Sequence, residues 1–202
     1  MENMKAIFLA TKTEKLKKEK QKMTTRQMVS MSMLAAISIV LVSIIHFPLF
    51  PAAPFLEYDP ADIPILIGTF AYGPIAGFVL TAVVSFIQGS TVSASSSIIG
   101  IVMHIVATGS CTLISGSIYQ KMKTKKGAAI SLIVGVITMT LAMVLMNLIL
   151  TPLFMGQPIE VVMTMLVPII IPFNLLKSSI NCLITFLLYK SISPILKGVS
   201  KK

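Results

Sequence analysis

Lys177 is a charged residue deep inside a long apolar run of this 202-residue chain, and two asparagines accompany it. Asn174, Lys177 and Asn181 are spaced i, i+3 and i+7, which places them on one face of a helix. A lysine at the centre of a membrane costs ~2.5 to 3.5 kcal/mol on insertion scales, so it is expected to face a partner or a wet cavity. The pattern predicts a pocket for a flat, mostly apolar ligand with one hydrogen-bonding edge.

Simpler roles for the same residues stay open at this point. The lysine stem can snorkel to an interface, and the two asparagines can act as packing contacts between helices. Pro168 and Pro172 come just before this helix face. Prolines free backbone carbonyls, which a membrane tolerates only where a cavity or other protein satisfies them. The two prolines therefore favour the pocket.

The composition around these residues is that of a membrane protein. The chain is 55% hydrophobic and 12% charged, well below the roughly 25% charged content of soluble domains. Its mean hydropathy is +0.90. The net charge of +10 comes from three basic blocks, at Lys5 to Arg26, Lys121 to Lys126 and Lys190 to Lys202. Cytoplasmic segments are rich in Lys and Arg, so topology explains the charge and no nucleic-acid partner is expected.

The apolar runs are long and do not alternate with polar residues, which predicts an all-α membrane protein. A run from residue 61 to 89 is broken at Tyr72-Gly73-Pro74. Counting it as two passes puts the lysines at 121–126 in the cytoplasm, together with both termini. We expect a basic cytoplasmic extension at 1–24, a substrate-binding domain at 25–197 and a basic tail at 198–202. The domain is predicted to be a compact bundle of six transmembrane helices, at about 27–45, 61–72, 74–89, 97–120, 128–150 and 161–189.

This topology brings further polar residues to the side of the membrane that holds Asn174. Gln88 is at the outer end of the third pass and Asn147 near the outer end of the fifth. The loop from His46 to Pro60 lies on the same side, and its four prolines exclude a helix through its middle. We therefore expect a pocket that opens outward beneath a structured loop.

Several kinds of chemistry find no support. His46 and His104 are far apart and have no cysteine or carboxylate at metal-ligand spacing. The serines from Ser93 to Ser97 have no base beside them, so an enzyme is not expected. No Gly-rich phosphate loop is present, and any ATP hydrolysis would belong to a partner. Ser32, Ala35 and Ala36 in the first pass are small enough to let a partner helix approach.

Three stretches carry a resemblance to a known family. They are Phe55-Leu56-Glu57-Tyr58-Asp59-Pro60-Ala61-Asp62-Ile63-Pro64-Ile65-Leu66-Ile67-Gly68, Tyr72-Gly73-Pro74-Ile75-Ala76-Gly77, and the Asn174-x-x-Lys177 pair. The chain resembles the S components of energy-coupling factor (ECF) importers, of the riboflavin-binding type. The resemblance implies capture of the vitamin outside a bacterial cell membrane and docking onto a transmembrane coupling subunit with two ATPases. Riboflavin is then a transported ligand, and no cofactor is implied.

The resemblance also implies roles for single residues. Asn147, Asn174 and Lys177 would face the isoalloxazine ring. Gln88 and the loop residues Pro54, Phe55, Leu56 and Tyr58 would close over the ring and the ribityl chain. The family's Ala-x-x-x-Ala docking motif is replaced here by Ser32-x-x-x-Ala36.

Other functions remain open on the sequence. The ligand could be a different vitamin, or the chain could be a stand-alone ion-coupled transporter or a membrane scaffold. Ion coupling has little support because Asp62 is at a helix start and no carboxylate falls within a pass. A lone Lys177 is a poor phosphate site, which favours a free vitamin over a phosphorylated one.

Overall fold

A computed structural model describes residues 24–197. The predicted extension at 1–24, apart from Thr24, and the predicted tail at 198–202 lie outside the described residues. The long helices are α2 (Thr25–Ile44), α5 (Ser97–Met122), α6 (Lys125–Met155) and α8 (Ile171–Lys197). The shorter elements are β1 (Phe47–Pro48), β2 (Glu57–Tyr58), α3 (Asp62–Tyr72), α4 (Pro74–Ser90), η1 (Ala94–Ser96), α7 (Ile159–Met165) and the π-helical turn η2 (Leu166–Ile170).

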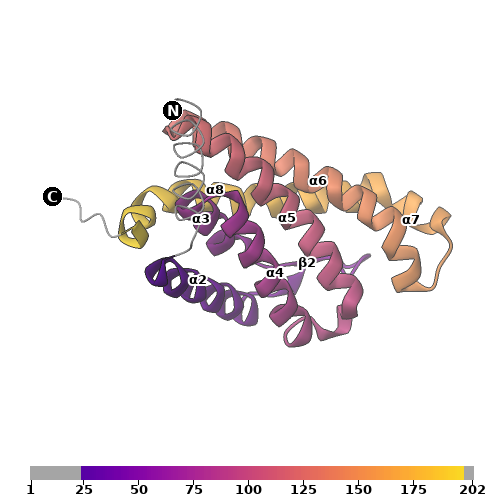
Figure 1. The fold of residues 1–202 in the computed structure, drawn as a ribbon. Coiled ribbons are helices and arrows are strands. Elements are labelled where there is room, and N and C mark those ends of the chain that lie inside the picture. Colours follow the sequence, from indigo (N-terminus) through magenta and orange to yellow (C-terminus); the bar gives the residue numbers. More distant parts are fainter. Residues whose placement is uncertain (1–23, 198–202) are drawn as a thin grey trace, which may run out of the picture.

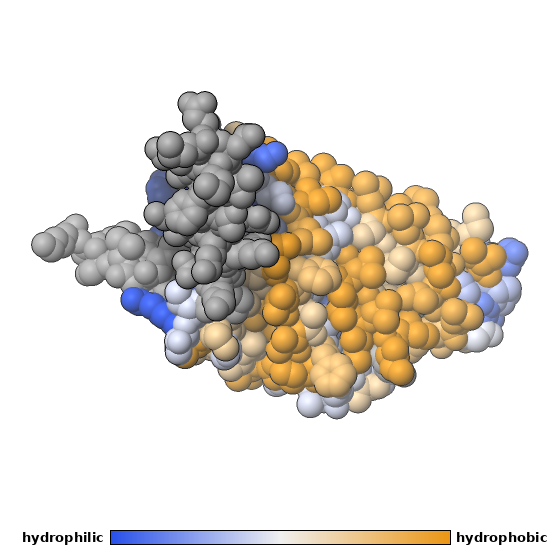
Figure 2. Space-filling view, in the orientation of Figure 1, coloured by the Kyte–Doolittle hydropathy of each residue, from blue (hydrophilic) through white to orange (hydrophobic). Residues whose placement is uncertain are grey.

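Four stretches of the described chain are helical, long and apolar enough to cross a membrane: Thr25–Ile44, Ile98–Met122, Lys125–Met155 and Ile159–Ile192. Their outward side chains are mostly apolar, and Figure 2 shows a broad hydrophobic surface around the middle of the molecule. Such a surface is stable only in a medium as apolar as itself. The prediction of an α-helical membrane protein is therefore confirmed.

Apart from Lys177, the described lysines and Arg26 lie in segments at one end of the bundle. The start of α2, the junction between α5 and α6 and the end of α8 all lie at the left of Figure 1, whereas α7 lies at the opposite end. Arg26, Lys121, Lys126 and Lys190 belong to those three segments. The described members of the three basic blocks, which are separate in the sequence, thus share one end of the fold.

Local sequence signals fix several helix ends. Thr24 and Gln27 form a reciprocal capping box at the start of α2. The Thr124 side chain accepts a hydrogen bond from the Gly127 amide at the start of α6. Gly73, with a φ of 102°, separates α3 from α4 at the predicted break. That backbone conformation suits glycine because glycine has no Cβ.

Helix α6 runs further than the sequence suggested. The predicted pass ended at residue 150, with Pro152 in the following loop, but the helix continues through Pro152 to Met155 and ends at the left-handed Gly156. A proline in a last turn removes only the bond to the carbonyl four residues earlier. The helix loses one bond there and keeps its apolar packing, so Pro152 does not end it.

Helix α3 lies in the core and not at the lipid surface. Ten of its eleven residues are buried, and it packs against α2, α4, α5 and α8. Eleven residues span only about 16 Å at the rise of an α-helix. Because the longer helices surround it, α3 can begin with a carboxylate, Asp62, that never meets lipid.

Gly116 allows α5 to approach the junction of α3 and α4, and Gly116→Ala is expected to destabilise the protein by about 1–3 kcal/mol. A Cβ there would lie 2.7 Å from Thr69 Cγ2 and 2.9 Å from the Pro74 Cα, which is backbone and cannot rotate away. Thermal unfolding in detergent measures the loss. Ser117→Ala, one residue along on the exposed side of α5, is the control. Equal melting temperatures for the two variants would contradict the close approach.

Candidate functional site

A cavity of about 150 Å³ lies between α4, α5, α6 and α8 and is bounded by the loop that leads into β2. Its apolar lining includes Phe55, Leu56, Met139, Met143, Phe154 and Phe173. Its polar lining includes Ser85, Gln88, His104, Asn147, Asn174 and Lys177. A mostly apolar cavity with a few polar groups is the usual form of a small-molecule site.

The structure brings most of the residues singled out in the sequence to this cavity. Those that line it are Phe55, Leu56, Gln88, Asn147, Asn174 and Lys177. Two others do not: Pro54 is exposed in the loop, and Tyr58 is buried behind the lining. Asn181, on the same helix face as Asn174, lies below the cavity in a polar network.

Lys177 points into the protein and has a counter-charge. Its Nζ donates to Asp59 Oδ2 at 2.7 Å and to the Glu57 carbonyl at 3.3 Å. The two side chains are only 12% and 5% exposed. The expected partner therefore exists, and the alternative of snorkelling to an interface is wrong. An ammonium has three N–H donors, so one is left for a ligand in the cavity that Lys177 lines.

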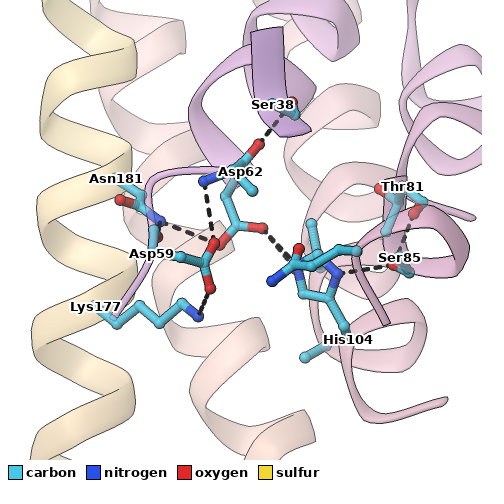
Figure 3. A network of polar contacts seen from close by, with 12 residues as sticks. Ser38, Asp59, Asp62, Thr81, Ser85, His104, Lys177 and Asn181 are labelled. Atoms are coloured by element: carbon cyan, nitrogen blue, oxygen red, sulfur yellow. Dashed lines mark hydrogen bonds and ion pairs between the residues drawn. The ribbon is translucent and has the colours of Figure 1, made fainter. Parts of the chain in front are cut away.

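Asp62 is the centre of a second buried network (Figure 3). Its Oδ1 contacts His104 Nε2 at 3.1 Å and accepts from Thr108 Oγ1 at 2.8 Å. Its Oδ2 accepts from Asn181 Nδ2 at 3.2 Å, and the same amide donates to the Asp59 carbonyl at 3.1 Å. Residues of α3, α5 and α8 thus meet on one carboxylate. The network extends from the core to Asp59 and so to the floor of the cavity.

The imidazole of His104 is fixed from both sides. A carboxylate only accepts hydrogen bonds, so the Nε2 that faces Asp62 carries a proton. Nδ1 lies 2.7 Å from Ser85 Oγ, which in turn bonds to the Thr81 carbonyl at 2.7 Å. In the described part of the chain, no three His, Cys, Asp or Glu side chains gather as a metal site would require. His104 thus bridges Asp62 of α3 and Ser85 of α4 in the cavity wall.

The amides of the cavity keep part of their hydrogen-bonding capacity free. Asn147 Nδ2 donates to the Met143 carbonyl and its Oδ1 accepts from Thr151, both at 2.8 Å. Asn174 Nδ2 donates to the Ile170 carbonyl at 2.8 Å. Gln88 Oε1 is buried and has no partner. Since buried polar atoms are nearly always paired, the unpaired Gln88 oxygen marks a place where a ligand can donate.

The loop above the cavity is pinned at a small antiparallel hairpin. Phe47 pairs with Tyr58 and Pro48 with Glu57, and the Glu57 carboxylate contacts the His46 imidazole. The Tyr58 hydroxyl donates to Asn181 Oδ1 at 3.1 Å. Burial, together with the nearby Asp59 carboxylate, raises the pKa of Tyr58. The hydroxyl therefore stays protonated and keeps this bond at physiological pH.

Sequence reasoning missed Asp59, Asp62, His104 and Ser85. The sequence analysis places Asp62 only at a helix start, and it excludes His104 as a metal ligand without giving it another role. A usable signal existed, because Lys177 needs a counter-charge and the chain beyond its basic extension has four acids. They are Glu57, Asp59, Asp62 and Glu160.

The small residues of the first pass divide between two surfaces. Ser32 and Ala36 are exposed on α2, one turn apart, whereas Ala35 is 8% exposed and packs in the core. Met28, Val29 and Met33 on the same helix are exposed apolar residues. The outward face of α2 thus combines small and flexible apolar side chains.

Comparisons with known proteins identify the family of this chain. The family described as "ECF transporter, substrate-specific component" matches residues 26–189. The riboflavin transporter FmnP of Bacillus subtilis is 29% identical, over 79% of this chain and 88% of its own. The riboflavin transporter RibU of Staphylococcus aureus is 27% identical, over 82% of this chain and 89% of its own.

A solved structure of the S component of a bacterial ECF transporter shares the fold, with a TM-score of 0.72 and 30% identity. It matches 85% of this chain and 97% of that one. Such proteins are transport subunits, so the prediction that this chain is not an enzyme is confirmed. The chain belongs to the substrate-specific components, or S components, of ECF transporters.

Proposed function

We propose that this protein captures riboflavin in the cavity described above and is the riboflavin-specific subunit of an ECF importer. The observation that carries the proposal is the set of polar groups on the cavity wall. Lys177 offers a donor, Asn147 and Asn174 offer donors and acceptors, and Gln88 Oε1 is a buried acceptor without a partner. The pyrimidine edge of a flavin alternates carbonyl acceptors with an N–H donor, which suits amides and an ammonium.

The apolar lining supports the same ligand. Met139, Met143 and Phe173 provide a surface for the flat isoalloxazine ring, and Phe55 and Leu56 from the loop cover it from another side. Methionine side chains adapt their shape to an aromatic ligand. Pro54 and Tyr58 do not line the cavity. Tyr58 anchors the loop through its hydrogen bond to Asn181, whereas Pro54 is exposed and has no proposed contact with the ligand.

The topology and the partners are part of the proposal. We place both termini in the cytoplasm of a bacterial cell, with six passes counted by treating α3 and α4 as separate segments. The gathering of basic residues at one end of the bundle supports this orientation. The exposed Ser32 and Ala36 on α2 are the proposed contact with a transmembrane coupling subunit, which two ATPases would drive.

The absorption spectrum of the detergent-purified protein is the direct test of this function. Bound riboflavin makes the preparation yellow and is displaced only slowly by dialysis, and binding quenches flavin fluorescence. Titration of ligand-free protein with riboflavin, thiamin, biotin and folate then ranks the vitamins. A natively folded protein that binds no flavin at micromolar concentration would refute the assignment, and tight binding of another vitamin would replace it.

Gln88→Met is expected to weaken riboflavin binding by up to about tenfold, the worth of one hydrogen bond. Thermal stability should stay equal or rise, because the substitution removes a buried acceptor that has no partner in the free protein. Fluorescence titration gives the affinity and thermal unfolding gives the stability. Gln157→Met, at an exposed position beyond α6, is the matched control. An unchanged affinity would remove Gln88 from the site.

A second candidate function is that of a stand-alone ion-coupled transporter, because the Asp62 carboxylate is buried in the protein interior. The sequence placed this acid at a helix start, outside any pass, but it is only 1% exposed and lies in the protein interior. Buried carboxylates inside membrane proteins often carry protons. Riboflavin uptake into vesicles that contain this protein alone, with a proton gradient and no ATP, would support that alternative.

A further inference from the structure

The hydroxyl group of Ser85 determines where the protons of the His104 ring lie (Figure 3). A hydroxyl has one proton to donate. Ser85 Oγ lies 2.7 Å from the Thr81 carbonyl oxygen, which can only accept, so the hydroxyl proton belongs to that bond. The contact between Ser85 Oγ and His104 Nδ1, also 2.7 Å long, therefore needs a proton from the ring. The opposite arrangement would leave two oxygens 2.7 Å apart with no proton between them.

Both ring nitrogens of His104 thus carry a proton. Nε2 donates to Asp62 Oδ1 at 3.1 Å, and Nδ1 donates to Ser85 Oγ. A histidine ring with protons on both nitrogens is a positively charged imidazolium. The His104 and Asp62 side chains are only 15% and 2% exposed. The two groups therefore form a buried ion pair, like Lys177 and Asp59.

The charges of the surrounding network also favour an imidazolium. Asp59 and Asp62 are two buried carboxylates, whereas Lys177 is the one fixed cation among the described side chains that line the cavity. A neutral His104 would leave one negative charge without a counter-charge in the protein interior, where an isolated charge is costly. With an imidazolium the network is neutral, because Lys177 balances Asp59 and His104 balances Asp62.

The other titratable groups around this network cannot supply the missing positive charge. They are Glu57, which faces His46, and Tyr58 in the loop, Cys111 on α5 and Cys182 on α8. A carboxyl group, a phenol or a thiol can become negative but not positive. The described α4 has no titratable side chain, and the lysines of α6 lie in its first turn, well before its first cavity-lining residue, Met139. The ring of His104 is therefore the group that carries the charge.

His104 connects the two polar sides of the cavity. On α4, Ser85 lies three residues before Gln88, so both side chains project from one face of that helix, and both line the cavity. On the other side, Asp62 accepts from an asparagine of α8 that lies one turn beyond Lys177. The hydrogen bonds of the imidazolium thus fix the separation between the Gln88 amide and the Lys177 ammonium.

We infer that His104 is an imidazolium in the ligand-free protein and a positioning residue for the ligand: its two N–H groups hold α4 and α3 at the separation that lets Gln88 and Lys177 reach the same molecule. The positioning role rests on the proposed function, because it concerns riboflavin in the same cavity. The protonation of the ring is independent of that function, because it is a property of the protein without ligand.

Nuclear magnetic resonance of the histidine rings tests the protonation. The chain has two histidines, His46 and His104. Protein labelled with an NMR-active nitrogen isotope in histidine alone gives two sets of ring signals, and His46→Gln assigns them. A ring nitrogen without a proton resonates far from one that carries a proton. We expect both nitrogens of His104 to show the protonated signal in ligand-free protein at neutral pH, and one unprotonated nitrogen would overturn the inference.

His104→Gln tests the positioning role. A glutamine amide can donate to Asp62 only while its carbonyl faces Ser85, so the charge and one donor are lost. Riboflavin affinity should fall about tenfold, as for Gln88→Met, because the Gln88 amide is no longer held in place. In the double variant His104→Gln with Gln88→Met the two losses should not add, since residues of one network are coupled. Full additivity would show that His104 does not position Gln88 and would overturn that role.

Ser85→Ala is a milder variant that keeps the ring and removes its α4 partner. Ser90→Ala is the matched control, because Ser90 also donates to the carbonyl four residues earlier but is exposed at the end of α4. Riboflavin affinity should fall by up to about tenfold in Ser85→Ala and stay unchanged in Ser90→Ala. Equal affinities would exclude the link from His104 to α4. If the wild-type protein binds no flavin, the proposed function fails, while the spectrum of the ligand-free protein still decides the charge of His104.

Discussion

Replacing Lys177 by methionine is expected to abolish tight riboflavin binding and to destabilise the protein by about 3–5 kcal/mol, the cost of leaving one member of a buried ion pair alone. Asp59 would lose its counter-charge while only 5% of its side chain reaches solvent. The ligand would lose a hydrogen bond to a charged donor, worth about 1.5–3 kcal/mol. Fluorescence titration and thermal unfolding in the same detergent measure the two losses.

The double variant Lys177→Met with Asp59→Asn separates the two effects. It removes both charges, so much of the lost stability should return while riboflavin binding stays weak. Lys126→Met, at an exposed position at the start of α6, is the control for a lost lysine. A single Lys177 variant with wild-type affinity would remove this residue from the ligand site.

Asp62→Asn is expected to lower stability by roughly 3 kcal/mol, because three donors from α5 and α8 converge on this buried carboxylate. An amide keeps one acceptor and presents its own N–H groups to the others. Riboflavin affinity should fall as well, since Asn181 links Asp62 to the Asp59 carbonyl beside the cavity. Thermal unfolding with and without riboflavin gives both quantities.

Glu160→Gln removes an exposed carboxylate and serves as the reference for this substitution. If Asp62→Asn melts at the same temperature as Glu160→Gln, the network in Figure 3 does not contribute to stability. If it melts lower but binds riboflavin normally, the network supports the core and not the site.

The cavity could be predicted from the sequence because some of its residues are polar where their neighbours in the chain are apolar. Lys177 and Asn174 are polar in an apolar run, and the structure places both in the lining. The Gly73-Pro74 break between α3 and α4 was equally local, because glycine adopts a positive φ without strain and proline fixes its own φ. Signals of this kind need no knowledge of the rest of the fold.

The partners of those residues could not be predicted in the same way. Asp62 and His104 are 42 positions apart, and Asp59 and Lys177 are 118 apart. These contacts depend on how α3, α5 and α8 pack against one another. Hydrophobic periodicity cannot show which face of a helix packs inward when the helix is apolar on all sides. The length of α6 differs from the predicted 128–150 for a related reason, because the helix keeps its packing through Pro152 although proline by itself favours a helix end.

The contact between Lys177 and the loop affects the rate at which a bound ligand leaves the cavity, as well as its affinity. Lys177 donates to Glu57 and Asp59, which follow the cavity-lining residues Phe55 and Leu56 in the chain. Moving this segment away from the cavity requires breaking an ion pair that water barely reaches. Departure of a bound molecule along that route is therefore a slow, activated event. Because buried pairs are only weakly screened by salt, the residence time should change little with ionic strength.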